Sequence, residues 1–190
     1  MSGSGQIQRE ELVLGVDPGL AATGYACVRR KGQGVEVVTK GLVRTAAGLP
    51  LEKRLERLFL QMQEVISAFQ PGVMALEEFY SSPEHPRTAI LMAHARGVIC
   101  LCAALNGVEV VDYAVREVKQ AVTGSGRASK EQVQRMVSAI ASLKEPAKPW
   151  DVADALALAV CHCLVRGASP LQNVLTRART TPIITGERAR

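Results

Sequence analysis

ELVLGVDPG, residues 11–19, is an apolar run that ends at an aspartate and is then broken by a Pro-Gly pair. A short apolar run of this kind predicts a buried strand, and Pro18-Gly19 predicts a turn directly after it. Two further strands are expected over residues 23–32 and 34–45, with a tight glycine-containing turn between them. The domain is therefore expected to begin with three strands, the first of which ends at Asp17.

Beyond these strands, helical and strand patterns alternate along the chain. Residues 51–69 carry apolar residues at helical spacing, and Pro71-Gly72 stops that helix. A strand over 73–78, a helix over 88–105, a strand over 108–114 and three more helices before residue 167 are expected to follow. This order predicts an α/β domain with a mixed five-stranded sheet and helices on both faces.

Length and composition limit the class of protein. A chain of 190 residues with 47% hydrophobic residues suits one domain, which we expect over residues 11–167. Residues 1–10 are expected to be a flexible extension, and residues 168–190 a basic, mobile tail. No run of 18 uninterrupted apolar residues occurs, which predicts a cytoplasmic protein without a transmembrane helix or membrane partner. The net charge of +5 favours a polyanionic partner.

The five cysteines show neither a disulfide framework nor the usual C-x2-C spacing of a zinc site. Cys100 and Cys102 form one C-x-C pair, and Cys161 and Cys163 form another around His162. Because residues two apart on a helix point in nearly opposite directions, buried free thiols are favoured over zinc ligands.

Four acidic residues lie at the ends of apolar elements, where packing of those elements does not require a charge. Asp17 ends the first strand, Glu77 ends the fourth, and Asp151 and Asp154 head an apolar helix, PWDVADALALAVCHC (149–163). Each has an ordinary explanation by itself, such as turn formation, a solvated strand end or capping of the helix N-terminus. Ligands of α/β sheets gather at the carboxyl ends of strands, so we expect the four to converge there.

Converging carboxylates would need cations among them, because their mutual repulsion otherwise raises some of their pKa values. Oxygen ligands without clustered His or Cys favour Mg²⁺, with Mn²⁺ as a substitute. Two such ions per subunit would support hydrolysis of a phosphodiester by in-line displacement. The sequence alone thus predicts a metal-dependent phosphoryl-transfer site.

The same residues resemble a known family, the RuvC family of Holliday-junction resolvases. The resemblance rests on GVDPGLAATGYACV (15–28), MALEEFY (74–80), ARGV (95–98), YAVREVKQAVTGSGRASKEQVQRMV (113–137) and DVADALALAVCHC (151–163). It spans residues 12 to about 166. It implies an RNase H-like fold of the retroviral-integrase superfamily, and a homodimeric endonuclease that nicks four-way junction DNA symmetrically during recombination and repair.

The resemblance also implies roles for individual residues. Asp17, Glu77, Asp151 and Asp154 match the family's four acidic metal-binding positions, and Glu77 is preferred to Glu78 because it directly follows Ala75-Leu76. Some members carry histidine where Asp151 stands. Lys119 and Lys130 match two family lysines that would hold phosphate oxygens, and Lys119 is expected to be catalytic.

Further DNA contacts are expected on loops and helix ends. Phe79 or Tyr80 would stack on unpaired bases at the junction centre, although one of the two would simply pack under its loop. Arg87, Arg116 and Arg127 are further candidates for contacts with the DNA. Packing or solvated helix surface is the ordinary alternative for each of these side chains.

A two-fold dimer matches the near two-fold symmetry of a four-way junction, and the helix over 88–105 is a candidate dimer element. The family also implies docking of a branch-migration motor complex. Three other functions stay open: an actin-like ATPase or sugar kinase, a non-catalytic junction-binding protein, and a related nuclease acting on RNA or other branched DNA. One DPG motif in 190 residues argues against the first, and the four acidic positions argue against the second.

Overall fold

The computed structural model describes residues 12–32, 34–78 and 86–166. The described part contains five strands and five helices, and each lies where the sequence predicts it. The strands are β1 Leu12–Asp17, β2 Ala22–Lys31, β3 Gly34–Arg44, β4 Val73–Glu77 and β5 Glu109–Tyr113. The helices are α1 Leu51–Phe69, α2 Pro86–Leu105, α3 Val115–Thr123, α4 Lys130–Ile140 and α5 Trp150–Arg166.

The strands form one mixed sheet in the order β3-β2-β1-β4-β5. β1 pairs antiparallel with β2, which in turn pairs antiparallel with β3, whereas β4 lies parallel to both β1 and β5. The predicted mixed five-stranded sheet is therefore confirmed. Because β1 and β4 are parallel neighbours, the residues that end them emerge at the same edge of the sheet.

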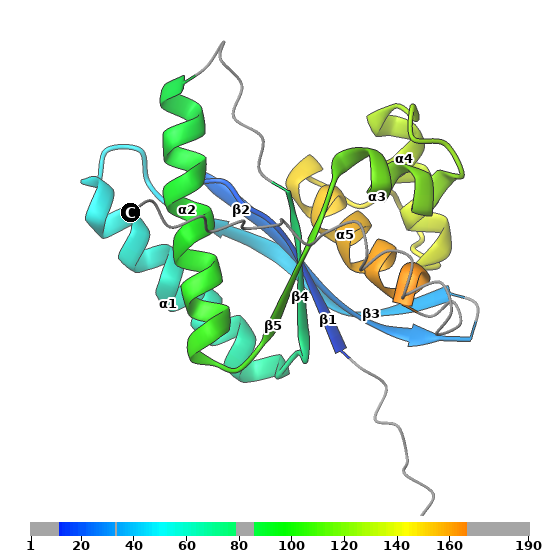
Figure 1. Cartoon of the computed structure of the whole chain (residues 1–190), viewed down its shortest axis with the longest axis horizontal. Coiled ribbons are helices and arrows are strands. Elements are labelled where there is room, and N and C mark those ends of the chain that lie inside the picture. Colours follow the sequence, from blue (N-terminus) through cyan, green and yellow to red (C-terminus); the bar gives the residue numbers. More distant parts are fainter. Residues whose placement is uncertain (1–11, 33, 79–85, 167–190) are drawn as a thin grey trace, which may run out of the picture.

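Helices cover both faces of the sheet, as predicted (Figure 1). α1 and α2 cover one face, where Leu14 and Val16 of β1 pack against Leu58 and Ile99 in one buried cluster. α3, α4 and α5 cover the other face, where Val13 lies in a second cluster with most of α5. Alternating residues of β1 thus enter two separate cores, as the two-residue period of a strand requires.

α5 packs directly on the backbone of the central strands. A Cβ atom on Gly15 of β1 would overlap the carbonyl oxygen of Ala155 and press on Ala159. Only glycine leaves room for so close an approach, and the small alanines of α5 complement it. α5 is buried along nearly its whole length, and its N-terminal end is held next to the end of β1.

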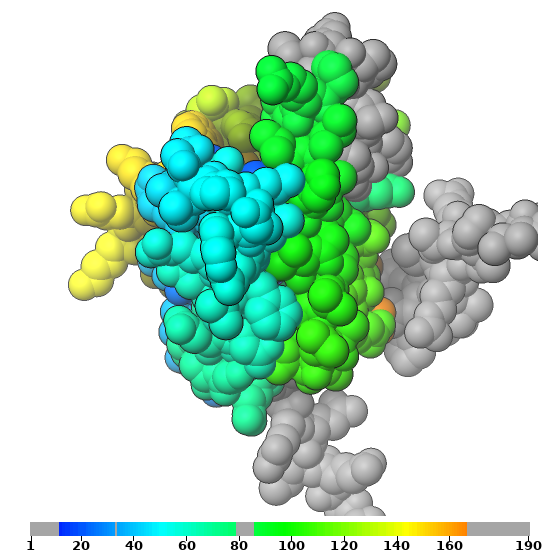
Figure 2. Space-filling view, turned by 90° about the vertical axis from the view of Figure 1, so that its left-hand side faces the viewer, coloured from blue at the N-terminus to red at the C-terminus, as the bar shows by residue number. Residues whose placement is uncertain are grey.

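α2 differs from α5 because much of its apolar surface is exposed. Ile90, Leu101 and Leu105 are 56%, 54% and 67% exposed, respectively. α2 runs beside α1, and its outer flank forms part of the molecular surface (Figure 2). A Cβ on Gly97 would meet nothing within 4 Å, so the described part of the chain leaves open space beside this glycine.

By length and composition, α2 could also cross a membrane, and it is the one such helix in the described ranges. This corrects the expectation, drawn from uninterrupted apolar runs, that no helix would pass such a test. Helices that cover a sheet pass the same test. α2 packs on α1 and β5, and its Arg96 forms an ion pair with Asp112, so here it belongs to the folded domain.

All five cysteines are free thiols, as expected, and only Cys100 is not fully buried. His162 is also buried, and its Nδ1 lies 2.9 Å from the hydroxyl of Tyr113. His162 is therefore a packed core residue.

Candidate active site

Asp17 and Glu77 lie side by side at one edge of the sheet. The parallel register pairs Val16 with Leu76, and the next residue on each strand is the acidic one. After Asp17 the chain turns sharply, and the buried Thr23 holds this turn. Its hydroxyl donates to the Gly19 carbonyl at 2.7 Å and lies 3.3 Å from the Gly19 N–H. The predicted Pro-Gly turn thus places the Asp17 carboxylate at the strand end.

The first turn of α5 brings the other two carboxylates to the same edge. Gly24 of β2 is paired with Asp17 in the antiparallel register, and a Cβ at Gly24 would overlap the backbone carbonyl of Asp151. This glycine lets the start of α5 rest on the β1–β2 backbone beside Asp17. Asp151 and Asp154 are both half-buried there.

The four carboxylates interact electrostatically. Burial, followed by the negative charges of Asp154, Glu77 and Asp151, raises the pKa of Asp17 from 3.8 to about 7. Burial and the charge of Asp154 also raise the pKa of Glu77. The structure therefore brings together the four acidic residues singled out from the sequence, and their mutual repulsion favours a bound cation.

Lys130 supplies positive charge within this acidic cluster. Its Nζ lies 2.8 Å from Oδ2 of Asp154, although the two residues are 24 positions apart in the chain. The hydrogen bond to Asp154 raises the pKa of Lys130, and the negative charges of Asp154, Asp17 and Glu77 act in the same direction. The ammonium group is therefore held at the carboxylates in its charged form.

The start of α4 is well defined, and this positions Lys130. Ser129 and Gln132 form a reciprocal capping box: the Ser129 side chain accepts from the Gln132 N–H, and the Ser129 N–H donates to Oε1 of Gln132. Lys119 has a different setting, half-buried on α3. Among the described residues, the positive charge of Lys130 acts to lower the pKa values of Asp17 and Glu77. Lys119 is not among the groups that shift these two pKa values.

Arg96 of α2 braces the chain at Glu77. Its Nε lies 3.5 Å from the backbone carbonyl of Glu77, and its Nη2 binds the carboxylate of Asp112 on β5. One guanidinium therefore links α2, β5 and the end of β4. This residue lies in the ARGV motif, but the sequence alone indicates no role for it.

The expected DNA contacts occupy different places. Phe79 and Tyr80 lie outside the described residues, as do the whole proposed extension and the whole proposed tail. Arg87 was expected in a loop, but α2 begins at Pro86, so Arg87 is an exposed residue of the first helical turn. Arg116 is exposed on α3, and its side chain passes directly over Gly126. Arg127 is exposed in the loop between α3 and α4.

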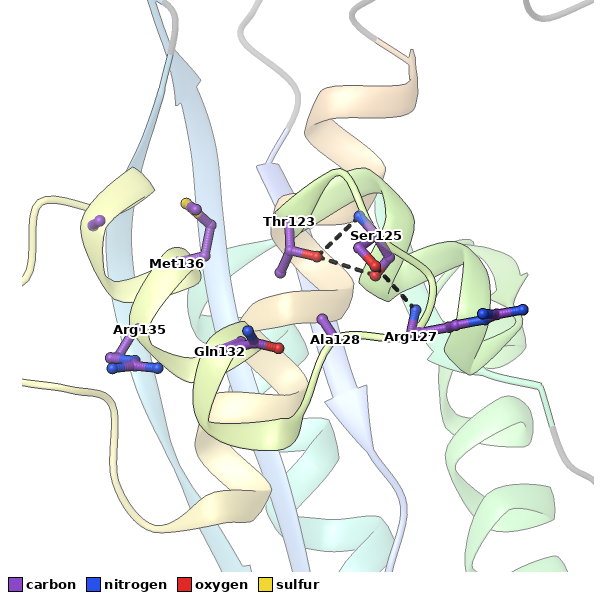
Figure 3. Close-up of a pocket in the computed structure, with 8 residues that line it drawn as sticks. Thr123, Ser125, Arg127, Ala128, Gln132, Arg135 and Met136 are labelled. Carbon is purple, nitrogen blue, oxygen red and sulfur yellow. Dashed lines mark hydrogen bonds between the residues drawn. The ribbon is translucent and has the colours of Figure 1, made fainter.

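A pocket of about 680 Å³ lies between the end of α3 and α4, and none of the four acidic residues lines it. Thr123 and Ser125 hydrogen-bond to each other at its edge, and the Arg127 side chain extends away from Arg135 (Figure 3). The two arginine side chains therefore do not converge on one point. The pocket is lined by Thr123, Ser125, Arg127, Ala128, Gln132, Arg135, Met136 and Ala139.

The donor set at the sheet edge fits a hard divalent cation. It consists of carboxylates alone, and burial together with mutual repulsion disfavours their charged forms. As the side chains stand, no three His, Cys, Asp or Glu residues of the described ranges are arranged to hold one metal ion. Lys130 is hydrogen-bonded to Asp154 in this arrangement. Metal binding there therefore requires the carboxylate side chains to approach one another.

Three residues that shape this site were missed by sequence reasoning: Gly24, Arg96 and Trp150. Gly24 and Arg96 do lie in the quoted motifs. A motif does not show, however, which backbone segment packs against a glycine or which carbonyl an arginine contacts. Trp150 directly precedes Asp151 and is exposed. Its position next to a candidate ligand, as the single tryptophan of the chain, was a usable signal.

A mixed five-stranded sheet with acidic residues at the ends of β1 and β4 and at the start of α5 defines a nuclease-type domain of the RNase H-like class. The sequence profile of the family described as "Crossover junction endodeoxyribonuclease RuvC" matches residues 13–162. The chain belongs to the RuvC family. A relative of that description from Moorella thermoacetica is 46% identical over 151 residues, which cover 80% of this chain and 90% of the relative.

Solved structures agree with this assignment. A structure described as Thermus thermophilus RuvC in complex with a Holliday junction substrate is 35% identical, with a TM-score of 0.76. The match covers 81% of this chain and 93% of that one. The yeast mitochondrial Holliday junction resolvase Ydc2 is only 10% identical but has a TM-score of 0.60, so it shares the fold. The RNase H-like fold predicted from the resemblance is thereby confirmed.

Proposed function

We propose that this chain is an endonuclease that resolves four-way DNA junctions by symmetric paired nicks, in homologous recombination and DNA repair. The observation that carries the proposal is the meeting of four carboxylates and one lysine at the sheet edge. Support comes from the match to RuvC in complex with a Holliday junction, which covers 93% of that chain. The substrate class is therefore taken from a relative that shares both the fold and most of its length.

In this proposal, Asp17, Glu77, Asp151 and Asp154 hold two divalent ions, Mg²⁺ or Mn²⁺, per subunit. When bound, such ions activate the attacking water and stabilise the leaving oxygen of a phosphodiester. The carboxylates lie on two strand ends and on a packed helix, so the core behind them fixes their backbone while the side chains rotate to meet an ion. Rigid placement lowers the reorganisation needed at the moment of reaction.

The basic side chains have a separate task in this mechanism. Lys130 can leave Asp154 and hold an oxygen of the scissile phosphate, where its charge offsets negative charge that develops in the transition state. We propose that Lys119 likewise holds a phosphate oxygen, further along the DNA strand. Arg87, Arg116 and Arg127 are proposed to bind the phosphate backbone, which positions the junction without reading its sequence. Phe79 or Tyr80 is proposed to stack on unpaired bases.

We further propose that the active form is a homodimer that uses α2 as its interface. The exposed apolar residues of α2 include Ile90, Leu101 and Leu105, and no described residue fills the space beside Gly97 on this helix. Burying this surface against a second copy would remove apolar area from water and place two acidic sites around one two-fold axis. Docking of a branch-migration motor complex, a cytoplasmic location and the division into extension, domain and tail remain predictions.

The test of the proposed function is cleavage of a labelled synthetic four-way junction and of a linear duplex with the same sequence. With Mg²⁺ or Mn²⁺, paired nicks are expected in the junction only. Asp151→Asn should lower the rate by at least about 100-fold while junction binding survives, because loss of even an outer partner of a metal site costs 10- to 100-fold.

Glu77→Gln and Glu78→Gln form a matched pair of neighbouring substitutions, and only the first should abolish cleavage. Binding without cleavage in either metal, over varied junction sequences, would indicate a junction-binding protein. Equal activity on RNA or on other branched DNA would indicate a related nuclease instead.

A further inference from the structure

Trp150 is an exposed aromatic residue at the edge of the acidic cluster. It is the first residue of α5, directly precedes Asp151 and is 41% exposed. Neither buried cluster of the domain includes it, so the core does not require an indole at this place. Large aromatic side chains are costly to leave in water and are commonly kept at a surface for binding.

Lys130 connects this ring to the carboxylates. Its Nζ lies 5.8 Å from the centroid of the Trp150 ring and 2.8 Å from Oδ2 of Asp154. The ammonium group of Lys130 therefore lies close to both the Trp150 ring and the acidic cluster. Consecutive nucleotides of a strand are about 3.4 Å apart along a duplex axis, which places Trp150 within about three nucleotides of a phosphate bound at Asp154.

We propose that Trp150 is a substrate-contacting residue that stacks on a base or sugar of the strand being cut, within about three nucleotides of the scissile phosphate. An indole face suits any nucleotide, because every base offers a π-face, and it adds affinity without a strict sequence requirement. Lys130, which lies close to both the ring and Asp154, holds the scissile phosphate, as in the proposed function. The inference rests on the proposed function, since it assumes that a DNA strand crosses the acidic cluster.

The chain contains a single tryptophan, so indole emission, excited selectively, reports on this position alone. The experiment uses the full chain with Glu77→Gln and no divalent ion, so that the DNA stays intact. An unlabelled four-way junction is titrated while indole emission and its quenching by acrylamide are recorded. Saturation with junction is expected to quench the emission and to lower the acrylamide quenching constant at least about twofold.

Binding is measured separately by the anisotropy of a labelled junction. Trp150→Ala should weaken binding by about 5- to 100-fold, the range of one base–aromatic stack, and Trp150→Phe should restore it to within about threefold. Leu60→Ala is the matched control, because Leu60 is an exposed apolar residue of α1, on the opposite face of the sheet. It should leave junction binding unchanged.

The outcomes separate this inference from the proposed function. Junction binding by anisotropy with unchanged indole emission and accessibility would overturn the role of Trp150 and leave the proposed function intact. A loss of binding in Trp150→Ala without any fluorescence response in the parent would mean that the indole only supports α5, which also overturns it. Absence of junction binding by anisotropy in the parent would refute the proposed function itself.

Discussion

The ammonium group of Lys130 lies 2.8 Å from a carboxylate oxygen of Asp154 and joins the start of α4 to the first turn of α5. Both residues are candidates for the chemistry, one as a phosphate-binding cation and the other as a metal ligand. The ion pair is partly exposed, so it contributes little to stability by itself. Its importance lies in placing one positive charge among four negative ones.

The first prediction concerns the two lysines. Lys130→Gln removes the positive charge nearest the carboxylates and should lower the single-turnover cleavage rate by about 100-fold, because one transition-state donor contributes about that much. Lys119→Gln should have a smaller effect on the rate, since Lys119 is not among the groups that shift the pKa values of Asp17 and Glu77. Rates measured at saturating junction would reveal the difference. A larger loss in Lys119→Gln would contradict the arrangement described.

The second prediction concerns the glycine that admits α5. Gly24→Ala places a Cβ on the carbonyl of Asp151, so the start of α5 must move. We expect a loss of about 1–3 kcal/mol in the free energy of unfolding, the usual cost of overpacking. We also expect up to about a 100-fold loss of cleavage, because a displacement of 1 Å can have that effect.

Denaturant unfolding and cleavage kinetics would be measured side by side for this variant. Gly48→Ala is the control, because a Cβ there meets nothing within 4 Å. Equal behaviour of the two alanine variants would show that α5 does not depend on Gly24.

The third prediction concerns His162 and pH. Burial, and then the charge of Arg166, lower the pKa of His162 from 6.5 to about 4. Between these values the unfolded chain binds a proton that the folded chain does not, so this residue makes stability fall as pH drops from about 6.5 towards 4. The expected loss is about 1–2 kcal/mol at pH 5 relative to pH 7.5.

The raised pKa of Asp17 acts in the opposite direction over much of this range, because the folded chain then binds the extra proton. The difference between the parent protein and His162→Gln therefore isolates the histidine. Urea unfolding at several pH values should show a smaller loss at pH 5 in His162→Gln than in the parent. His94→Gln is the control, because His94 is an exposed residue of α2. An unchanged pH slope in His162→Gln would refute the assignment.

The fourth prediction concerns the outer face of α2. Gly97→Lys adds a long charged side chain where the described residues leave open space, so the fold should tolerate it. Lysine also favours a helix by up to about 1 kcal/mol over glycine. A dimer through α2 would nevertheless be disrupted by the charge.

Light scattering of the purified protein should give the mass of two chains for the parent and of one chain for Gly97→Lys. Paired nicking should become unpaired or be lost in the variant. Leu60→Lys, on α1, should leave the mass unchanged, because that leucine is equally exposed on another helix. A dimer that persists in Gly97→Lys would place the interface elsewhere.

The helices, the strands and the four acidic residues could all be predicted from the sequence. Apolar runs, helical spacing and Pro-Gly punctuation depend on neighbours within a few positions, and every strand and helix they predicted is present. Asp17 and Glu77 could be chosen because a carboxylate at the end of a buried strand is unusual and parallel strands end at one edge. Their convergence with the aspartates of α5 followed from residue type and position.

Contacts between residues far apart in the chain became visible only in the folded domain. Lys119 and Lys130 look alike in the sequence, yet only Lys130 is hydrogen-bonded to Asp154. The role of Gly24 depends on a helix more than a hundred residues away, and the exposure of α2 depends on which face its neighbours leave uncovered. Such contacts are set by how helices pack on the sheet, because that packing brings together side chains whose local patterns carry no information about each other.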